Sequence, residues 1–216
     1  MYRKFLDQLR EINPHLKVVG FTATPYRLDS GMLHKGRERV FDDIAYSANI
    51  GDMIKQGYLC PVSAKWTDAC QDTSGVGKRG GEFIAGDLER AVDQHQLNAA
   101  IAQEIVERGH GHGSWLVFAT GTSHAQHLRD EIAANGISAE CVFGDTSDAK
   151  RQNILDRFKA GKLRCVVNVN VLTTGFDAPG VDLIAMCRPT ASPGLYVQMI
   201  GRGTRLAEGK ENCLVL

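Results

Sequence analysis

Two arginines near the end of the sequence offer the most specific chemistry in the chain. Residues 198–205 read QMIGRGTR, so Arg202 and Arg205 are three positions apart on a predicted helix end. Guanidinium groups are permanently charged and present planar pairs of donors, which suits a polyphosphate. Such an arginine can stabilise the charge on a γ-phosphate during phosphoryl transfer. A pair of surface arginines on a solvated helix end is an equally good interpretation of this motif alone.

A second candidate segment, residues 173–182, reads TTGFDAPGVD and follows a predicted strand. The hydroxyls of Thr173 and Thr174 could hold the backbone phosphates of a nucleic acid, and Gly175 would let the main chain approach closely. Asp177 could accept a hydrogen bond from a ribose hydroxyl or orient an arginine. Taken alone, an ordinary turn explains the Gly, Asp and Pro residues somewhat better.

Two further segments carry hydroxyl groups at the ends of predicted strands. Thr22 and Thr24 would leave a strand on the same side and could relay a hydrogen bond between two sites. Thr120 and Gly121 precede a predicted helix whose N-terminus could attract a phosphate. For each segment alone a structural role is the better interpretation, with Ser123 as a plain N-cap in the second.

The sequence lacks the residues that would bind and cleave a nucleotide without help. It contains neither the phosphate loop G-x-x-x-x-G-K-[ST] nor a D-E-x-[DH] carboxylate pair for magnesium. None of the six cysteines forms a C-x-x-C pair, and His110 and His112 lie among glycines in a way that is typical of a loop. We therefore expect no metal site, and no hydrolysis of ATP by this chain alone.

The elements that must position these residues alternate regularly from residue 114 onward. Apolar runs predict strands at residues 115–119, 139–143, 164–169, 182–186 and 213–216. Helical periodicity predicts helices at 123–134, 148–159 and 193–200. This alternation predicts an α/β fold with a parallel sheet, whose ligands lie at the carboxyl ends of the strands. The loops after Ala119, Val169 and Met186 are therefore the places to search.

The first half of the chain is less regular. It predicts helices at residues 3–12, 49–57 and 87–108 and a strand at 16–21, with Asn49 as N-cap and Gly57 as the stop of the second helix. Residues 72–81 contain four glycines and the basic pair Lys78 and Arg79. This composition favours a solvated linker, although the basic pair could touch a nucleic-acid backbone.

The composition limits the classes of protein to consider. Lys plus Arg and Asp plus Glu both number 25, so a contact to nucleic acid must be a local patch. No apolar run is long enough to span a bilayer and no signal peptide begins the chain, so we expect a cytoplasmic protein without membrane contact. The abrupt start and the final strand suggest a fragment.

The order of the four segments is more specific than any one of them. T-A-T, F-A-T-G-T, T-T-G-F-D and Q-x-x-G-R-x-x-R together resemble motifs III to VI of the superfamily-two helicases, over about residues 16–206. The runs TATPYRLD (22–29), FDDI (41–44) and GYLCP (57–61) look like the DEAD/DEAH-type branch that contains RadD-like helicases and the motor subunits of type I or III restriction enzymes. The match to the RadD-like group is closer.

The resemblance implies two RecA-like domains with ATP and Mg²⁺ in the cleft between them. Residues 1–60 would be the C-terminal part of the first domain and residues 61–216 the second domain. Motifs I and II, which hold most of the ATP and Mg²⁺, would precede Met1. The partners would then be the rest of the helicase chain and a nucleic acid, most simply DNA, while the oligomeric state stays open.

The resemblance also implies a role for each motif residue. Arg202 and Arg205 resemble the catalytic arginine fingers. The residues that resemble the nucleotide side of the site are Gln198, Gly201, Gly175 and Asp177. Those that resemble nucleic-acid contacts are Thr120, Gly121, Thr173 and Thr174, and Thr22 and Thr24 resemble the coupling hydroxyls. A restriction-enzyme motor subunit and a non-catalytic nucleic-acid-binding α/β module are the alternatives.

Overall fold

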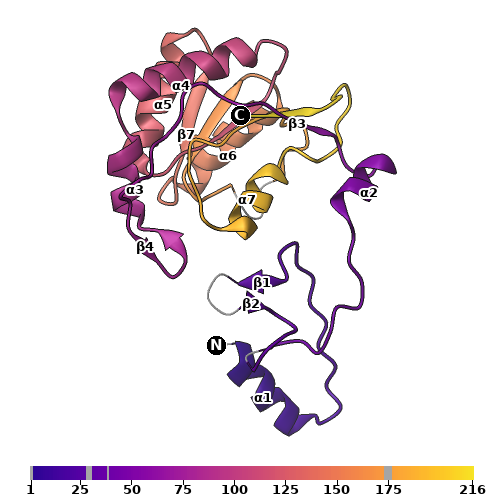
Figure 1. Cartoon of the computed structure of the whole chain (residues 1–216). Coiled ribbons are helices and arrows are strands. Elements are labelled where there is room, and N and C mark those ends of the chain that lie inside the picture. The colour runs from indigo at the N-terminus through magenta and orange to yellow at the C-terminus, as the bar shows by residue number, and fades with distance from the viewer. Residues whose placement is uncertain (1, 28–30, 38, 173–176) are drawn as a thin grey trace. The chain divides into compact units, whose positions relative to one another are not determined.

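The computed structural model describes residues 2–27, 31–37, 39–172 and 177–216. The chain folds as two compact units, residues 1–48 and 49–216, which are coloured from indigo to yellow along the chain in Figure 1. The sequence predicts a boundary near residue 60. The second unit begins earlier, and the Cys60 N–H already donates to the Thr204 carbonyl at 2.6 Å within it. That residues 1–60 belong to a first helicase domain stays a prediction.

In the residues that the structure describes, the first unit contains one helix and one short hairpin. α1 (Tyr2–Ile12) confirms the predicted helix, and β1 (Tyr26–Arg27) pairs with β2 (Gly31–Met32) in antiparallel fashion. The predicted strand at residues 16–21 is wrong: this segment lies in no described sheet, and Val19 and Phe21 are exposed. A strand needs a neighbour for its N–H and C=O groups, and no described strand lies beside this one.

The second unit is built on a six-stranded sheet in the order β3-β10-β9-β6-β8-β7. All five pairings are parallel, which confirms the predicted fold class. The strands are β3 (Val62–Ala64), β6 (Trp115–Phe118), β7 (Ala139–Val142), β8 (Cys165–Asn168), β9 (Leu183–Ala185) and β10 (Cys213–Val215). Sequence patterns predicted all of these except β3, which is only three residues long and half exposed.

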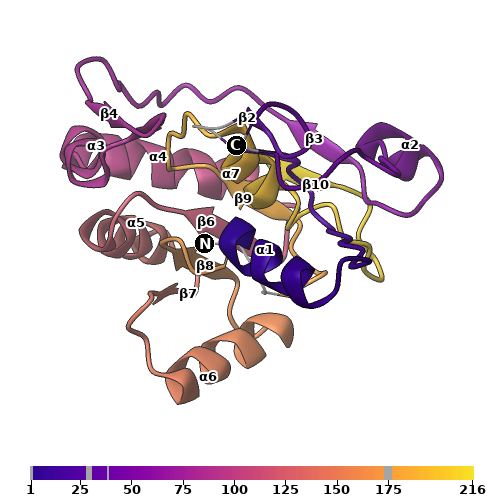
Figure 2. The ribbon, with the colours of Figure 1, turned by 90° about the horizontal axis from the view of Figure 1, so that it is seen from below.

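Six helices in the described part of the chain accompany this sheet, and four of them cover its two faces. The six are α2 (Ile50–Lys55), α3 (Ala85–Val92), α4 (His95–Arg108), α5 (Thr122–Ala134), α6 (Asp148–Lys159) and α7 (Pro193–Ile200). α4 and α5 lie side by side in both ribbon views (Figures 1 and 2) and cover one face, while α6 and α7 pack on the other. Strand β6 alternates accordingly: Trp115 and Val117 face α4 and α5, whereas Leu116 and Phe118 face α6 and α7.

Capping explains where two of these helices begin and end. The Asn49 side chain accepts from the Asp52 N–H at 3.2 Å, and Gly57 has φ +74°, so the predicted start and stop of α2 are confirmed. The single helix predicted at 87–108 is instead two helices. Asp93 leaves the helical conformation after α3, and its carboxylate accepts from the Asn98 side chain at 2.7 Å at the start of α4.

The segment predicted as a solvated linker contains a second hairpin. β4 (Lys78–Arg79) pairs with β5 (Glu82–Phe83), and the two glycines between them have φ of +62° and +84°, as a two-residue hairpin turn requires. Glu82 accepts from the Thr190 hydroxyl at 2.5 Å and from the Ala191 N–H at 3.0 Å. The linker prediction is wrong here because this long-range anchor orders the hairpin.

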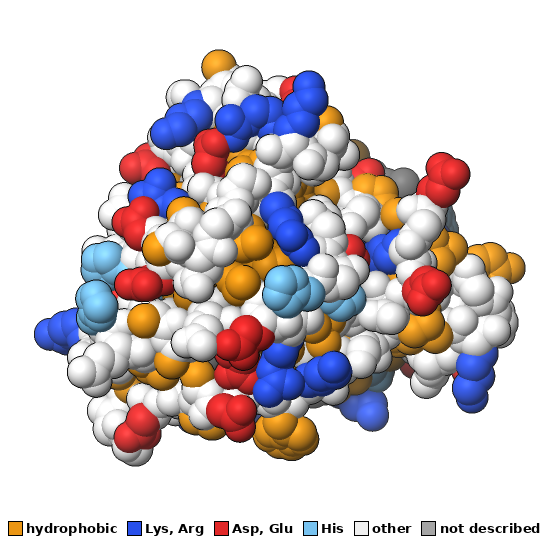
Figure 3. All heavy atoms as spheres, turned by 90° about the horizontal axis from the view of Figure 1, so that it is seen from above, with side chains coloured by type: hydrophobic (Ala, Val, Ile, Leu, Met, Phe, Trp, Pro, Cys, Tyr) orange, Lys and Arg blue, Asp and Glu red, His pale blue; other side chains and the backbone are white. Residues whose placement is uncertain are grey.

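The distribution of charge on the surface agrees with the equal numbers of basic and acidic residues in the sequence. Basic and acidic side chains are interspersed over the face shown in Figure 3. Among the described residues, none of the helices combines the length and apolarity that crossing a membrane requires.

We predict that Asn168→Leu destabilises the second unit. Asn168 is fully buried at the carboxyl end of β8; its side-chain amide donates to the Val117 carbonyl at 2.9 Å and accepts from the Leu172 N–H at 3.4 Å. Unsatisfied buried groups cost about 1–3 kcal/mol each, so the free energy of unfolding should fall by about that amount. Urea unfolding followed by tryptophan fluorescence measures it, because Trp115 is buried in the same sheet. The matched control Asn153→Leu, at an exposed position of α6, should change stability by less than about 0.5 kcal/mol.

Candidate functional site

The Arg205 and Asp177 side chains bring two of the predicted motifs together. The Arg205 Nη1 lies 2.5 Å from the Asp177 Oδ1, although the residues are 28 positions apart. Asp177 follows β8 in the chain, and Arg205 lies in the turn after α7. The sequence suggested that Asp177 could orient an arginine, and the structure shows this ion pair.

Arg202 places a second guanidinium in the same region. α7 ends at Gly201, whose N–H donates to the Val197 carbonyl at 2.8 Å, and the Arg202 N–H donates to the Met199 carbonyl at 3.2 Å. Burial lowers the pKa of Arg202, and the positive charge of Arg205 lowers it further, while Asp177 opposes both effects. Two arginines that influence each other in this way form a local concentration of positive charge, which favours an anion.

Lys210 links the chain just after Asp177 to the turn after α7. The sequence analysis did not assign it a role. Its ammonium donates to the carbonyls of Pro179 at 3.1 Å, Gly203 at 2.7 Å and Arg205 at 2.9 Å. Burial lowers its pKa. A single lysine in a turn carries no spacing signal, so the sequence could not have revealed these contacts.

Gly203 and Thr204 hold the turn after α7 against the sheet. A Cβ on Gly203 would lie 2.2 Å from the Cys213 Sγ of β10, so only glycine fits this close approach. The Thr204 hydroxyl donates to the Gly201 carbonyl at 3.1 Å, and the Thr204 carbonyl accepts from Cys60. The sequence analysis did not assign a role to either residue.

The remaining predicted nucleotide residues lie on or near the same elements. Gln198 is half-buried on α7, and Gly201 is the C-cap of that helix. Gly175 lies outside the described residues, as do Thr173 and Thr174 of the predicted nucleic-acid contacts.

Thr120 and Gly121 lie at the start of α5, but a protein carboxylate already occupies the helix N-terminus. Glu89 of α3 accepts from the N–H groups of Ser123 at 3.1 Å and His124 at 3.3 Å. A Cβ on Gly121 would lie 2.0 Å from the carboxyl carbon of Glu89. Gly121 is the N-cap residue, so the expectation that Ser123 caps this helix is wrong.

The Thr120 side chain is buried and engaged. Its hydroxyl lies 3.5 Å from the Cys187 carbonyl, and its N–H donates to the His124 Nδ1 at 3.3 Å. Burial lowers the pKa of His124 to about 4, so this ring is neutral near pH 7 and can accept that hydrogen bond.

Thr22 and Thr24 lie in the first unit and bond to each other. The Thr22 hydroxyl donates to the Thr24 carbonyl at 3.1 Å and accepts from the Thr24 N–H at 3.0 Å. The Thr22 side chain therefore bonds to the backbone two residues further on, which is a local side-chain-to-backbone contact.

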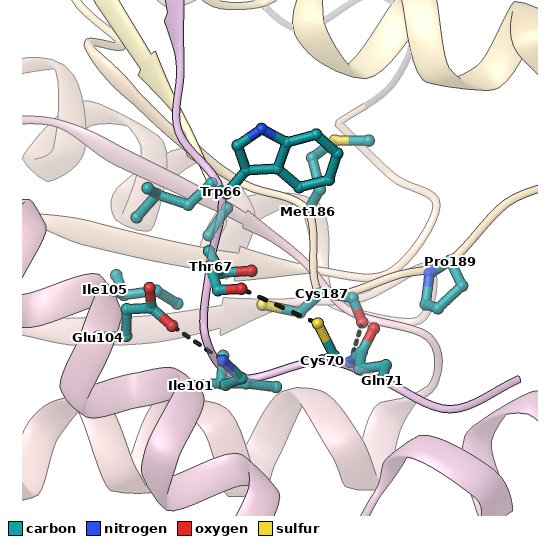
Figure 4. A pocket seen from close by; sticks show the side chains of 13 residues that line it. Trp66, Thr67, Cys70, Gln71, Ile101, Glu104, Ile105, Met186, Cys187 and Pro189 are labelled. Carbon is teal, nitrogen blue, oxygen red and sulfur yellow. Dashed lines mark hydrogen bonds between the residues drawn. The ribbon is translucent and has the colours of Figure 1, made fainter.

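A separate pocket of about 290 Å³ lies at the carboxyl ends of β9 and β10. Figure 4 shows Trp66, Cys70 and Gln71 from the chain after β3 opposite Cys187 and Pro189 from the chain after β9. The Gln71 amide donates to the Cys187 carbonyl at 3.0 Å, and Glu104 accepts from the N–H groups of residues 68 and 69. None of the predicted site residues lines this pocket, so we place the candidate site at the arginines.

The donor set of the arginine site fits phosphate oxygens better than a metal ion. Two guanidinium groups offer charged donors and no lone pairs, and the Asp177 carboxylate pairs with Arg205. Over residues 2–27, 31–37, 39–172 and 177–216, no group of three His, Cys, Asp or Glu side chains could hold a metal ion. A phosphate or a similar oxyanion is the class of ligand that two guanidinium groups suit.

Sequence comparison places this fold and site in a known family. The model of the helicase conserved C-terminal domain matches residues 96–207, which include α4 to α7 and both arginines. The chain belongs to this family. It is a superfamily-two helicase C-terminal region with a RecA-like parallel sheet, as the order of its motifs predicted.

Two curated relatives align along nearly the whole chain. One is "Putative ATP-dependent helicase IRC3" of Saccharomyces cerevisiae, which is 32% identical over 219 residues, covering 100% of this chain and 31% of the relative. The other is "Putative mitochondrial ATP-dependent helicase irc3" of Schizosaccharomyces pombe, which is 35% identical over 213 residues, covering 93% and 32%. The chain thus spans about a third of the length of these relatives.

A solved structure extends the likeness to the whole fold. The fragment of "a putative HsdR subunit of a type I restriction enzyme from Vibrio vulnificus YJ016" has a TM-score of 0.71 and 22% identity. The match covers 98% of this chain and 41% of that fragment. At this identity the comparison supports the fold alone.

We predict that Gly203→Ala moves the turn after α7 and destabilises the second unit. The added Cβ would overlap the buried Cys213 Sγ, and overpacking of this kind costs about 1–3 kcal/mol. The second substitution Cys213→Ala should recover part of that loss, which urea unfolding of the single and double variants would show. Gly86→Ala is the control, because a Cβ there meets nothing within 4 Å on α3; equal losses for both glycines would contradict the close approach.

Proposed function

We propose that this chain is the second motor domain, with the end of the first, of an ATP-dependent DNA helicase or translocase. The observation that carries the proposal is the Arg205–Asp177 ion pair, which joins the segments resembling motifs V and VI. Membership of the helicase C-terminal family and the names of the two curated relatives support the ATP-dependent motor function.

In this proposal Arg202 and Arg205 bind the γ-phosphate of a nucleotide held mainly by the first domain. ATP supplies the phosphoryl group that is transferred to water, together with Mg²⁺ bound by motifs I and II. Asp177 restricts where the Arg205 guanidinium points, and Gln198, Gly201 and Gly175 would contact the nucleotide. The arginines then act as electrostatic stabilisers of charge that develops on the phosphate.

The nucleic acid would contact the segments that precede these residues. Thr173 and Thr174 are candidate donors to backbone phosphates, and contacts of this kind carry no sequence information. Thr120 and Gly121 are the other candidate contacts, and a phosphate there would have to displace the Glu89 carboxylate from the N-terminus of α5. Thr22 and Thr24 would couple ATP hydrolysis to movement of the nucleic-acid strand.

A motor subunit of a type I or III restriction enzyme is the second candidate. The fold match to the HsdR fragment covers nearly all of this chain, and this is the observation that supports the second candidate. A nuclease or methylase domain in the longer protein would select this candidate over a stand-alone helicase. We further propose that the chain alone does not hydrolyse ATP, and that the longer protein acts in the cytoplasm; the name of the S. pombe relative describes that protein as mitochondrial.

We predict that Arg205→Ala lowers the ATP turnover of the full-length protein by more than tenfold. Arginine fingers contribute roughly 10³–10⁵ to turnover, so even a partial role exceeds this threshold. Steady-state ATP hydrolysis with saturating nucleic acid measures the effect.

The matched control is Arg90→Ala on α3, because Arg90 also pairs with an aspartate, Asp87, at 2.5 Å. Its turnover should match that of the unmodified protein. If Arg205→Ala and Arg90→Ala both leave turnover unchanged, the chain is a non-catalytic binding module and the motor function is wrong.

A further inference from the structure

The Lys210 ammonium has all three of its donors directed at main-chain carbonyls. The acceptors are Pro179, Gly203 and Arg205, at 3.1, 2.7 and 2.9 Å. An ammonium has three N–H groups, so these contacts satisfy its full capacity. No carboxylate is among the acceptors, which means that Lys210 holds backbone and does not serve as half of an ion pair.

The three carbonyls belong to the two segments that form the candidate site. Pro179 lies two residues after Asp177, and Gly203 and Arg205 form the turn after α7. Two links therefore join these segments. The first is the Asp177–Arg205 side-chain pair, and the second runs through Lys210, which binds the backbones of both segments. The Arg205 backbone and its guanidinium are both held, by different partners.

Lys210 is suited to this position by its chemistry and its surroundings. A lysine carries a compact charge whose three donors can turn toward three separate acceptors. Gly209, at φ +74°, turns the chain so that Lys210 faces back toward the site. The charged and titratable groups that act on it are Cys213, Cys60, Asp182 and Arg205, and burial lowers its pKa.

We propose that Lys210 is a positioning residue that sets the place of the Arg205 guanidinium by clamping the loop after β8 against the turn after α7. This inference rests on the proposed function, since it gives Arg205 a role in ATP turnover. Without the clamp, Arg205 would still be present but would no longer be held where the phosphate needs it. The loss should therefore fall on turnover and not on binding of ATP.

The test is a double-mutant cycle in the full-length protein with Lys210→Met, Arg205→Ala and both together. We expect Lys210→Met to lower kcat for ATP at least tenfold and to leave the KM for ATP within about twofold. If Lys210 acts through Arg205, the double variant is no slower than Arg205→Ala alone, because coupled residues are not additive. The control is Lys159→Met, at an exposed lysine on α6, which should keep the original kcat.

A second variant separates positioning from folding. Circular dichroism and thermal unfolding show whether Lys210→Met is folded at the assay temperature. Should it unfold, the cycle is repeated with Lys210→Gln, whose amide retains two donors; we expect this folded variant to have a lower kcat for ATP than the unmodified protein.

Each outcome decides between the two ideas. If Arg205→Ala has no effect on kcat, the proposed function and the inference both fail. If Arg205→Ala is impaired while folded Lys210 variants keep the original kcat, the inference is overturned and the proposed function stands. A rise in KM without a fall in kcat, or an additive loss in the double variant, would likewise show that Lys210 does not act through Arg205.

Discussion

The candidate site depends on one constraint: two segments far apart in the sequence must be held at one place by polar contacts. The Asp177–Arg205 pair does this with side chains, and Lys210 does it through main-chain carbonyls. Asp177 is 76% exposed, so the ion pair contributes little to stability, since exposed pairs give about 0–1 kcal/mol. Its value is orientation: it holds a flexible guanidinium in one direction.

The parallel sheet makes this arrangement possible because it fixes where each segment begins. β8 and β9 flank β6, and apolar side chains on both faces of the sheet are buried against α4 to α7. At the end of β8, the Asn168 side chain accepts a hydrogen bond from the Leu172 N–H and so holds the first residues after the strand. The core thus fixes the point at which the chain leaves β8.

Carboxylates from the chain between β3 and β6 bind two other segments by accepting backbone N–H groups. Glu82 binds the chain that leads to α7, and Glu89 binds the N-terminus of α5. Burial opposes ionisation of Glu82, but hydrogen bonds from Thr190, Ala191 and Phe83 and the charge of Arg188 hold its pKa below the usual range. Glu82 and Glu89 thus connect the chain between β3 and α4 to segments that lie more than 30 residues further along the sequence.

The sequence by itself determined the α/β class, five of the six strands and the helices from 122 onward, because buried strands and amphipathic helices are local patterns. It also singled out Arg202 and Arg205 as candidate site residues, because a short polar motif is a local pattern as well. Only the tertiary structure decided what depends on distant partners. Examples are the ordered hairpin at Lys78–Phe83, the unpaired segment at 16–21, the carboxylate of Glu89 at the N-terminus of α5, and the contacts of Lys210. No local pattern encodes such contacts, since a lone lysine or glutamate reads as a solvated surface residue until the fold brings its acceptors or donors to it.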